Sequence, residues 1–193
     1  MTSNNSSCED IVRHIGLAMG VARSLQTISK ASNFPSDTKL LLYRSISRSI
    51  LLFNAESWYV KEKDKRKLRI FEMSVLRRTF GFSLTERRHN QSMREGLGMD
   101  ADIVQLVQQR RLMSFEHIIR MDQRRLPYIL MYGRMHGTRP RERPNKRWLD
   151  NITDDCAEME MTTTSATRLA IDRSRWTIAV ARLLERTDPS VSS

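Results

Sequence analysis

The sequence predicts a mainly α-helical protein: a bundle-like set of helices, a C-terminal helical segment, and a basic loop rich in Gly, Pro and Arg. Apolar residues recur at spacings of three and four along most of the 193-residue chain, as on one face of a helix, whereas the alternating pattern of a half-buried strand is scarce. Hydrophobic residues make up 39% and charged residues 28%, which is ordinary for a folded globular protein. The length suits one domain or two small ones.

The first helix is expected to run from about Glu9 to Ser29, because apolar residues from Ile11 onward keep helical spacing. Ser7 and Asp10 stand at the spacing of a capping box at its start. Residues 1–10 are otherwise expected to form a disordered N-terminus.

Two further helices and a short element are expected before residue 98. One helix follows the turn at Pro35 and ends near Phe53, and the next is centred on Phe71 and ends at Gly81, which suits a left-handed cap position. A shorter element is expected from about Asn90 to Gly96. The polar face of the helix that ends at Gly81 carries five basic residues: Lys65, Lys67, Arg69, Arg77 and Arg78.

Residues 99–136 are expected to form a linking helical region. A strongly amphipathic helix is predicted through Ile103 to Ile119, and the positive end of its dipole explains Asp100 and Asp102 just before it. Leu126 to Met135 is apolar with a mixed pattern, which fits either a strand or a helical turn.

Residues 137–147 are expected to form a basic loop, because Gly, Pro and Arg replace helix-forming residues there. Helical periodicity returns from about Lys146 to Met159, and Thr164 or Ser165 is placed to cap a last helix. The remaining divisions are C-terminal helices over 148–186 and a disordered tail over 187–193.

Trp148 and Trp176 are expected to anchor the C-terminal core. Leu149 and Ile152 continue an apolar stripe beside Trp148, which favours its burial. The alternative for Trp148 is an exposed indole that stacks on a base.

The charge of the chain points to nucleic acid as its partner. Lys and Arg total 33 against 22 Asp and Glu, a formal charge of +11 that attracts polyanions. Arginine binds phosphate through two parallel hydrogen bonds, so we expect contacts to the phosphates of RNA, DNA or an RNA–DNA hybrid. The alternative is a solvated charged surface that only keeps the protein soluble. The candidate contacts are Arg139, Arg141, Arg143, Lys146 and Arg147 in the basic loop, and Arg110, Arg111, Arg77 and Arg78 on helices.

The residues present argue against an independent enzyme. Cys8 and Cys156 are far apart and the four His are scattered, so neither a metal site nor a cofactor is expected. Asp154 and Asp155 are neighbours on a helix and are expected on its solvated face. The sequence has no nucleophile elbow and no Gly-rich phosphate loop. It also has no apolar run long enough to cross a membrane, so the protein is expected to be soluble. The lack of a disulfide framework fits a reducing compartment inside the cell, either the nucleus or the cytoplasm.

Seven short motifs follow one another between residues 11 and 180. They are Thr38-Lys39-Leu40-x-x-Tyr43, Ala55-Glu56-x-Trp58, Phe71-Glu72-Met73-x-x-Leu76-Arg77-Arg78-x-x-Gly81, Arg94-Glu95-x-Leu97-Gly98, Arg110-Arg111-Leu112-x-x-x-x-His117-Ile118-x-Arg120-Met121, Arg143-Pro144-x-Lys146-Arg147-Trp148-Leu149-Asp150 and Asp172-Arg173-x-x-Trp176. Together with the helix over Ile11 to Lys30, they resemble the C-terminal part of the reverse transcriptases of non-LTR (LINE-like) retrotransposons. Each motif is weak by itself, and their common order carries the resemblance.

The resemblance implies that residues 11–98 form a thumb-like region, and that the chain holds a template–primer duplex behind a polymerase active site. It also implies a palm and fingers domain as a partner, because the family's metal-binding aspartates would lie upstream of residue 1. The chain would then be a nucleic-acid-binding fragment of an RNA-directed DNA polymerase and not an enzyme by itself. The alternatives are a decayed element copy with no selected activity, a helical protein-interaction module, and an independent helix-turn-helix DNA-binding protein.

The sequence departs from the family pattern at three places. Glu116 and Glu142 each stand where the family commonly has Gly, and Phe53-Asn54 replaces a commoner Tyr-Gly. The two glutamates bring negative charge close to the candidate contacts.

We expect the simultaneous change of Arg139, Arg141 and Arg143 to Ala to weaken nucleic-acid binding about equally for all sequences and to flatten its salt dependence, because phosphate contacts release counterions. Fluorescence anisotropy across a salt series measures both effects. An unchanged affinity and salt slope would remove the basic loop from the contact surface.

Overall fold

The computed structural model of the chain describes residues 7–26, 34–82, 89–99, 101–132 and 148–185. Every regular element within these ranges is a helix, and no strand occurs among them, so the predicted mainly α class is confirmed. The basic loop lies outside the described residues, and with it the five candidate contacts that it carries.

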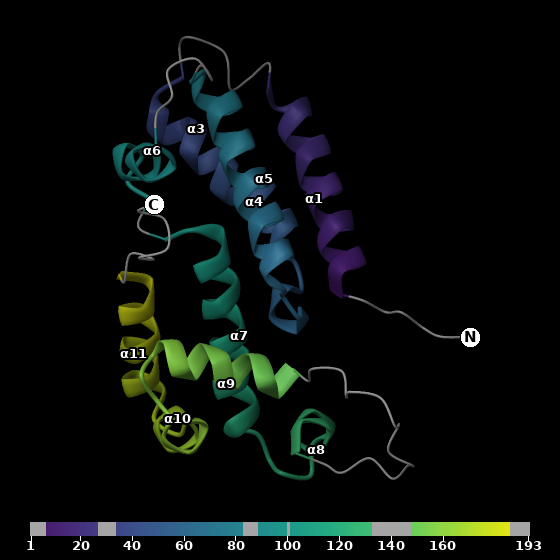
Figure 1. Cartoon of the computed structure of the whole chain (residues 1–193), viewed down its shortest axis with the longest axis vertical. Helices are drawn as coiled ribbons and strands as arrows, with labels where there is room; N and C mark the ends of the chain where they lie inside the picture. The colour runs from purple at the N-terminus through teal and green to yellow at the C-terminus, as the bar shows by residue number, and fades with distance from the viewer. Residues whose placement is uncertain (1–6, 27–33, 83–88, 100, 133–147, 186–193) are drawn as a thin grey trace, which may run out of the picture.

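The N-terminal third forms two antiparallel helical stretches (Figure 1). Helix α1 spans Ser7–Ser24, so the expected disorder is wrong for residues 7–10, which form its first turn. Helix α3 (Ser36–Leu42) continues through a π-helical turn at Tyr43–Ser47 into α4 (Arg48–Leu51), near the predicted end at Phe53. A short 3-10 turn at Ala55–Ser57 follows.

Position 54, where the family pattern has Gly, has a backbone that Gly would favour. Asn54 adopts φ 58° and ψ 21°, in the left-handed region. Asn is one of the few residues that tolerate this conformation, because its short polar side chain hydrogen-bonds locally. Asn at position 54 is therefore compatible with the sharp turn before Ala55.

Helices α5 and α6 follow the sequence prediction closely. Helix α5 spans Glu62–Phe80 and ends at Gly81, whose φ of 72° confirms the left-handed cap. Helix α6 spans Asn90–Gly96.

Helix α7 (Ile103–Ile119) also has the predicted bounds, and its cap explains why it starts where it does. The side chain of Asp102 accepts hydrogen bonds from the backbone N–H groups of Val104 and Gln105, and the Asp102 N–H donates in turn to the side-chain oxygen of Gln105. This capping box confirms that the carboxylate before the helix has a structural role.

The C-terminal third decides between two open alternatives and corrects one prediction. The apolar run that fitted either a strand or a helical turn contains a helix, α8 (Leu126–Tyr132). After α9 (Trp148–Glu158), the expected single last helix is two helices, α10 (Thr163–Ala170) and α11 (Arg173–Glu185).

The caps of α10 and α11 explain the break. Thr162, and not the expected Thr164 or Ser165, caps α10 by accepting from the Ser165 N–H. The Asp172 carboxylate accepts from the N–H groups of Ser174 and Arg175, so a new helix starts at this point.

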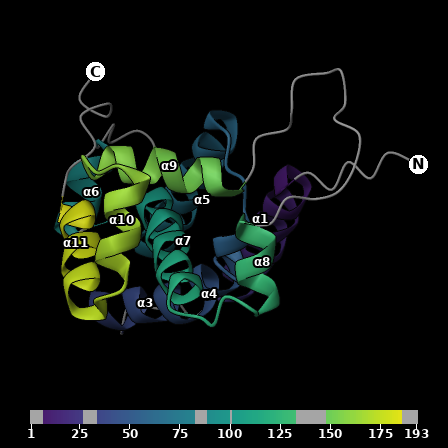
Figure 2. The same cartoon turned by 90° about the horizontal axis from the view of Figure 1, so that it is seen from below.

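Two apolar cores are built on opposite ends of α7 (Figures 1 and 2). The first core packs α1, α3–α4 and α5 against Ile103 and Val107 at the start of α7, and the second packs α9, α10 and α11 against Leu112 and Phe115 near its end. Helix α7 therefore holds the two halves together.

Both predicted tryptophan anchors lie in the second core. Trp176 is fully buried and its Nε1–H donates to the Leu112 carbonyl at 3.2 Å, while the half-buried Trp148 donates to the Glu56 carbonyl at 2.7 Å. Glu56 lies next to Trp58 of the first core, so the hydrogen bond from Trp148 to the Glu56 carbonyl connects the two halves.

A buried ion pair crosses the same boundary. The Arg111 guanidinium binds the Asp155 carboxylate through Nε to Oδ2 at 2.6 Å and through Nη2 to Oδ1 at 2.7 Å, and its Nη1 reaches the Trp58 carbonyl at 3.3 Å. Arg111 is 4% and Asp155 2% exposed. Two expectations are corrected: Asp155 does not lie on a solvated face, and Arg111 is not available to a phosphate at the surface.

We expect Arg111→Ala to lower the free energy of unfolding by about 3–5 kcal/mol, because it leaves a buried carboxylate unpaired. Urea unfolding followed by circular dichroism measures the change. The matched control is Arg13→Ala, which breaks an ion pair with Asp10 of 2.9 Å at the surface and should cost less than about 1 kcal/mol. Equal losses in the two variants would show that the buried pair contributes no special stability.

Candidate nucleic-acid interface

The helical candidate contacts lie at different depths. Arg78 is exposed and Arg77 half-buried at the end of α5, and Arg110 is exposed on α7. Arg111 is in the interior, because one step along a helix rotates the side chain by about 100°. Arg77 and Arg78 are the two that line a groove together with Arg66 and Arg69.

These arginines line a groove of about 690 Å³ along the outer face of α5, between the end of α1 and the start of α6. The charged part of its lining consists of Arg66, Arg69, Arg77 and Arg78, and the apolar part includes Ile70, Met73 and Phe82. Neither Arg66 nor Arg69 was among the predicted contacts. Helical spacing could have found both, because positions 66, 69 or 70, 73 and 77 share one face.

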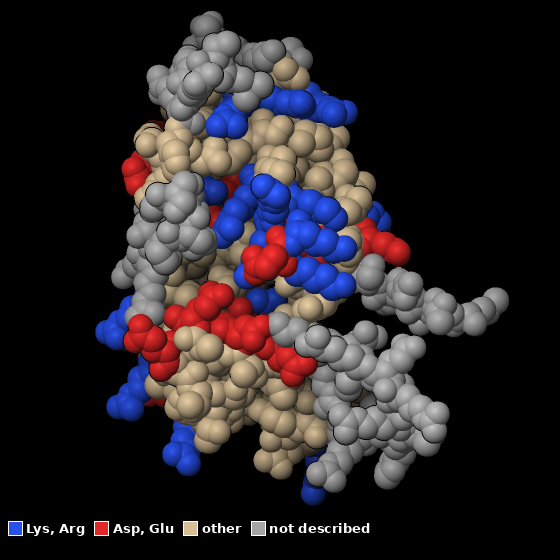
Figure 3. All heavy atoms as spheres, in the orientation of Figure 1, with Lys and Arg blue, Asp and Glu red and all other residues tan. Residues whose placement is uncertain are grey.

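The surface around the groove is strongly divided in charge (Figure 3). Lys and Arg gather over α5, whereas Asp and Glu form a band over α9 directly beneath it. The exposed members of the basic surface include Lys61, Lys63 and Arg66, and the exposed acidic residues of α9 are Asp150, Asp154 and Glu158. The charges of the described residues therefore attract a polyanion to α5 and repel it from α9.

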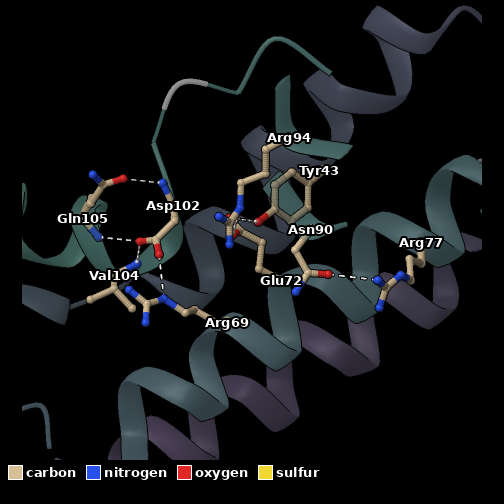
Figure 4. A network of polar contacts seen from close by, with 9 residues as sticks. All are labelled: Tyr43, Arg69, Glu72, Arg77, Asn90, Arg94, Asp102, Val104 and Gln105. Atoms are coloured by element: carbon tan, nitrogen blue, oxygen red, sulfur yellow. Dashed lines mark hydrogen bonds and ion pairs between the residues drawn. The ribbon is translucent and has the colours of Figure 1, made fainter. Parts of the chain in front are cut away.

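Two of the groove arginines are fixed by neighbouring elements (Figure 4). The Arg69 Nε–H donates to the Asp102 carboxylate at 2.7 Å, and the Arg77 Nη2–H donates to the Asn90 side-chain oxygen at 2.9 Å. The same Asp102 carboxylate caps α7. The guanidinium groups are thus held in place by the starts of α7 and α6, so less side-chain freedom is lost when an anion binds.

Beneath the groove, α6 is attached to α5 by a buried acidic residue (Figure 4). Glu72 is fully buried, accepts a hydrogen bond from the Tyr43 hydroxyl at 3.2 Å, and forms an ion pair with Arg94 of α6 at 3.3 Å. The two atoms of this ion pair, Glu72 Oε2 and Arg94 Nε, are not aligned for a hydrogen bond, and neither atom has another hydrogen-bond partner. Burial raises the pKa of Glu72 to about 7, and the Arg94 charge opposes that rise.

Within the described part of the chain, no group of three His, Cys, Asp or Glu could hold a metal ion. Burial raises the pKa of the Cys156 thiol to about 11, which keeps it in the unreactive protonated form. None of the helices in the described ranges is both long and apolar enough to cross a bilayer.

Comparison with known proteins assigns no family to the chain: no protein-family model, no curated protein and no solved structure matches it. The arrangement of arginines on α5 is therefore interpreted from its own geometry.

We expect the free energy of unfolding to fall as the pH rises from about 4.5 to 7, by up to about 3 kcal/mol from Glu72 alone. The pKa of Glu72 is about 7 in the folded state against 4.5 in its reference state, so the folded protein binds this proton more tightly within that window. Glu72→Gln should remove this part of the pH dependence in urea unfolding at pH 5 and 7.5. Glu62→Gln, at an exposed position of the same helix, should leave it in place.

Proposed function

We propose that the chain binds nucleic acid through its phosphates, using the groove on α5, and that it does so without reading base sequence. The observation that supports this most directly is the groove lined by Arg66, Arg69, Arg77 and Arg78, which all project from one helix. Arginine is suited to this task because its planar fork matches two phosphate oxygens.

The dimensions of the row suit a polynucleotide backbone. From Arg66 to Arg77 the helix rises by about 16 Å, at about 1.5 Å per residue. One strand of a duplex advances about 3.4 Å per nucleotide, so the row matches about five nucleotides of one strand. Contacts of this kind position a nucleic acid and carry no sequence information.

We further propose that the chain is the thumb and post-thumb part of a non-LTR retrotransposon reverse transcriptase, and that it holds template–primer next to a separate palm domain. The order of the seven motifs supports this. The motif that ends at Gly81 supplies Arg77 and Arg78 to the groove, and the motifs with Trp58 and Trp176 supply buried core residues. A module that holds template–primer requires both a surface that contacts the nucleic acid and a core that supports this surface.

A protein-interaction module is the second candidate, and α8 favours it. Leu126, Ile129 and Leu130 on this short helix are 66%, 48% and 66% exposed. Exposed apolar patches of this kind are typical of surfaces that contact another protein. This candidate predicts self-association or partner binding that does not change when the α5 arginines are replaced.

Binding of labelled RNA–DNA hybrid, duplex DNA and single-stranded RNA, measured by fluorescence anisotropy across a salt series, tests the first candidate. We expect a linear fall of log affinity with log salt, and the tightest binding identifies the preferred form of nucleic acid. No binding at low salt by a folded, helical protein would reject the proposal.

We expect the double variant Arg66→Gln and Arg78→Gln to bind all three nucleic acids more weakly, with the salt slope for duplex DNA reduced by about 1.8, or about 0.9 for each lost phosphate contact. These two arginines are the exposed ones of the groove.

The matched control is Arg168→Gln with Arg182→Gln, which removes the same charge from exposed positions on α10 and α11. The control should keep the slope of the parent protein. Equal effects of the two double variants would mean that net charge alone, and not the groove, determines binding.

A further inference from the structure

A second group of arginines lies apart from the groove and has no acidic partner. Arg44 stands in the π-helical turn, Arg48 begins α4, and Arg110 projects from α7. Among the residues that the structure describes, none of these three guanidinium groups is within ion-pair distance of a carboxylate. Other arginines of the fold, such as Arg69 and Arg94, do have one.

Backbone carbonyls hold two of the three side chains. The Arg44 Nη2–H donates to the Gly98 carbonyl at 3.0 Å, and the Arg110 Nη1–H donates to the Leu52 carbonyl at 2.6 Å. Each bond uses one N–H of a five-donor group. The Nε of Arg44 is buried and has no hydrogen-bond partner. Both groups are therefore oriented and still have unused donors.

The three positive charges are close enough to affect one another. Arg44 and Arg48 are one helical turn apart. Leu52 lies one turn beyond Arg48, since its N–H donates to the Arg48 carbonyl at 2.9 Å. The Arg110 guanidinium donates to the carbonyl of this same Leu52. Burial lowers the pKa of the half-buried Arg48, and the positive charges of Arg44 and Arg110 lower this pKa further. The nearby Tyr43 and Glu72 raise it. A half-buried cluster of like charges is unfavourable unless an anion is bound.

The local backbone also favours a binding role. A π-helical turn is a rare interruption of an α-helix and is frequently found at functional sites. Here it lies at Tyr43–Ser47, and the Arg48 N–H bonds to the Tyr43 carbonyl across it. The turn thus carries Arg44 itself and precedes Arg48.

We propose that Arg44, Arg48 and Arg110 form a binding site for a phosphate group. A tetrahedral dianion can accept hydrogen bonds from several guanidinium groups at once, and it would neutralise the repulsion among them. The site shares no residue with the groove, and α4 lies behind α5 in Figure 1. The phosphate could belong to a polynucleotide backbone or be a free anion, and the proposal does not depend on nucleic acid binding in the groove.

The test compares the full chain with Arg48→Gln, because the Arg48 side chain makes no hydrogen bond in the described part of the chain and can be changed without breaking a contact of its guanidinium to a carbonyl. The melting temperature is measured in sodium phosphate and in sodium chloride of equal ionic strength. Arg168→Gln is the control for loss of one charge, and it also shows the general stabilisation that phosphate gives to any protein. Arg48→Lys keeps the charge and serves as a second variant.

We expect phosphate to raise the melting temperature of the parent and of Arg168→Gln more than that of Arg48→Gln, which should bind phosphate about tenfold more weakly. Arg48→Lys should be intermediate, because it keeps the charge without the planar fork. Equal phosphate effects in all four proteins, or none in the parent, would overturn the proposal.

Anisotropy with a labelled single-stranded DNA then separates the two sources of phosphate. Weaker DNA binding by Arg48→Gln than by Arg168→Gln would identify a backbone phosphate as the ligand. Unchanged DNA binding together with the lost phosphate effect would identify a free anion. Either result supports the site, and failure of the groove variants to affect DNA binding would leave this conclusion unchanged.

Discussion

The arrangement of the whole molecule depends on how α7 is held by its buried polar partners. The apolar contacts of a helix permit some rotation and sliding, but a guanidinium that binds both oxygens of a carboxylate permits very little. The Arg111–Asp155 pair therefore fixes the orientation of α9 on α7. The hydrogen bond from the same Arg111 to the Trp58 carbonyl attaches the first core to α7 at this position. Gln108 adds a contact to Glu158 at 2.7 Å. Charge removed from water is costly, so this arrangement tolerates little disorder.

The elements that sequence reasoning predicted well have local signals at their ends. The bounds of α5 and α7 follow from Gly81 and Asp102, which act on the backbone within a few residues. The prediction was less successful where a boundary depends on distant packing. Periodicity runs through Asp172 without interruption, so the division between α10 and α11 could be found only from the cap that Asp172 provides.

The candidate site was predictable to a smaller extent. Composition and helical spacing located the basic face of α5, because arginines on one face of one helix are a local pattern. The role of Arg111 was not predictable, since its partner Asp155 is 44 residues away and both looked like ordinary surface charges. The contacts of Arg44 and Arg110 are with backbone carbonyls, which leave no trace in a sequence.

Within the described part of the chain, the separation of basic α5 from acidic α9 creates an electric dipole in addition to a net positive charge. Near a polyanion such a body experiences a torque in addition to attraction, so it turns its α5 side forward before contact. This orientation raises the fraction of collisions that are productive, and the advantage declines as salt shortens the range of the field.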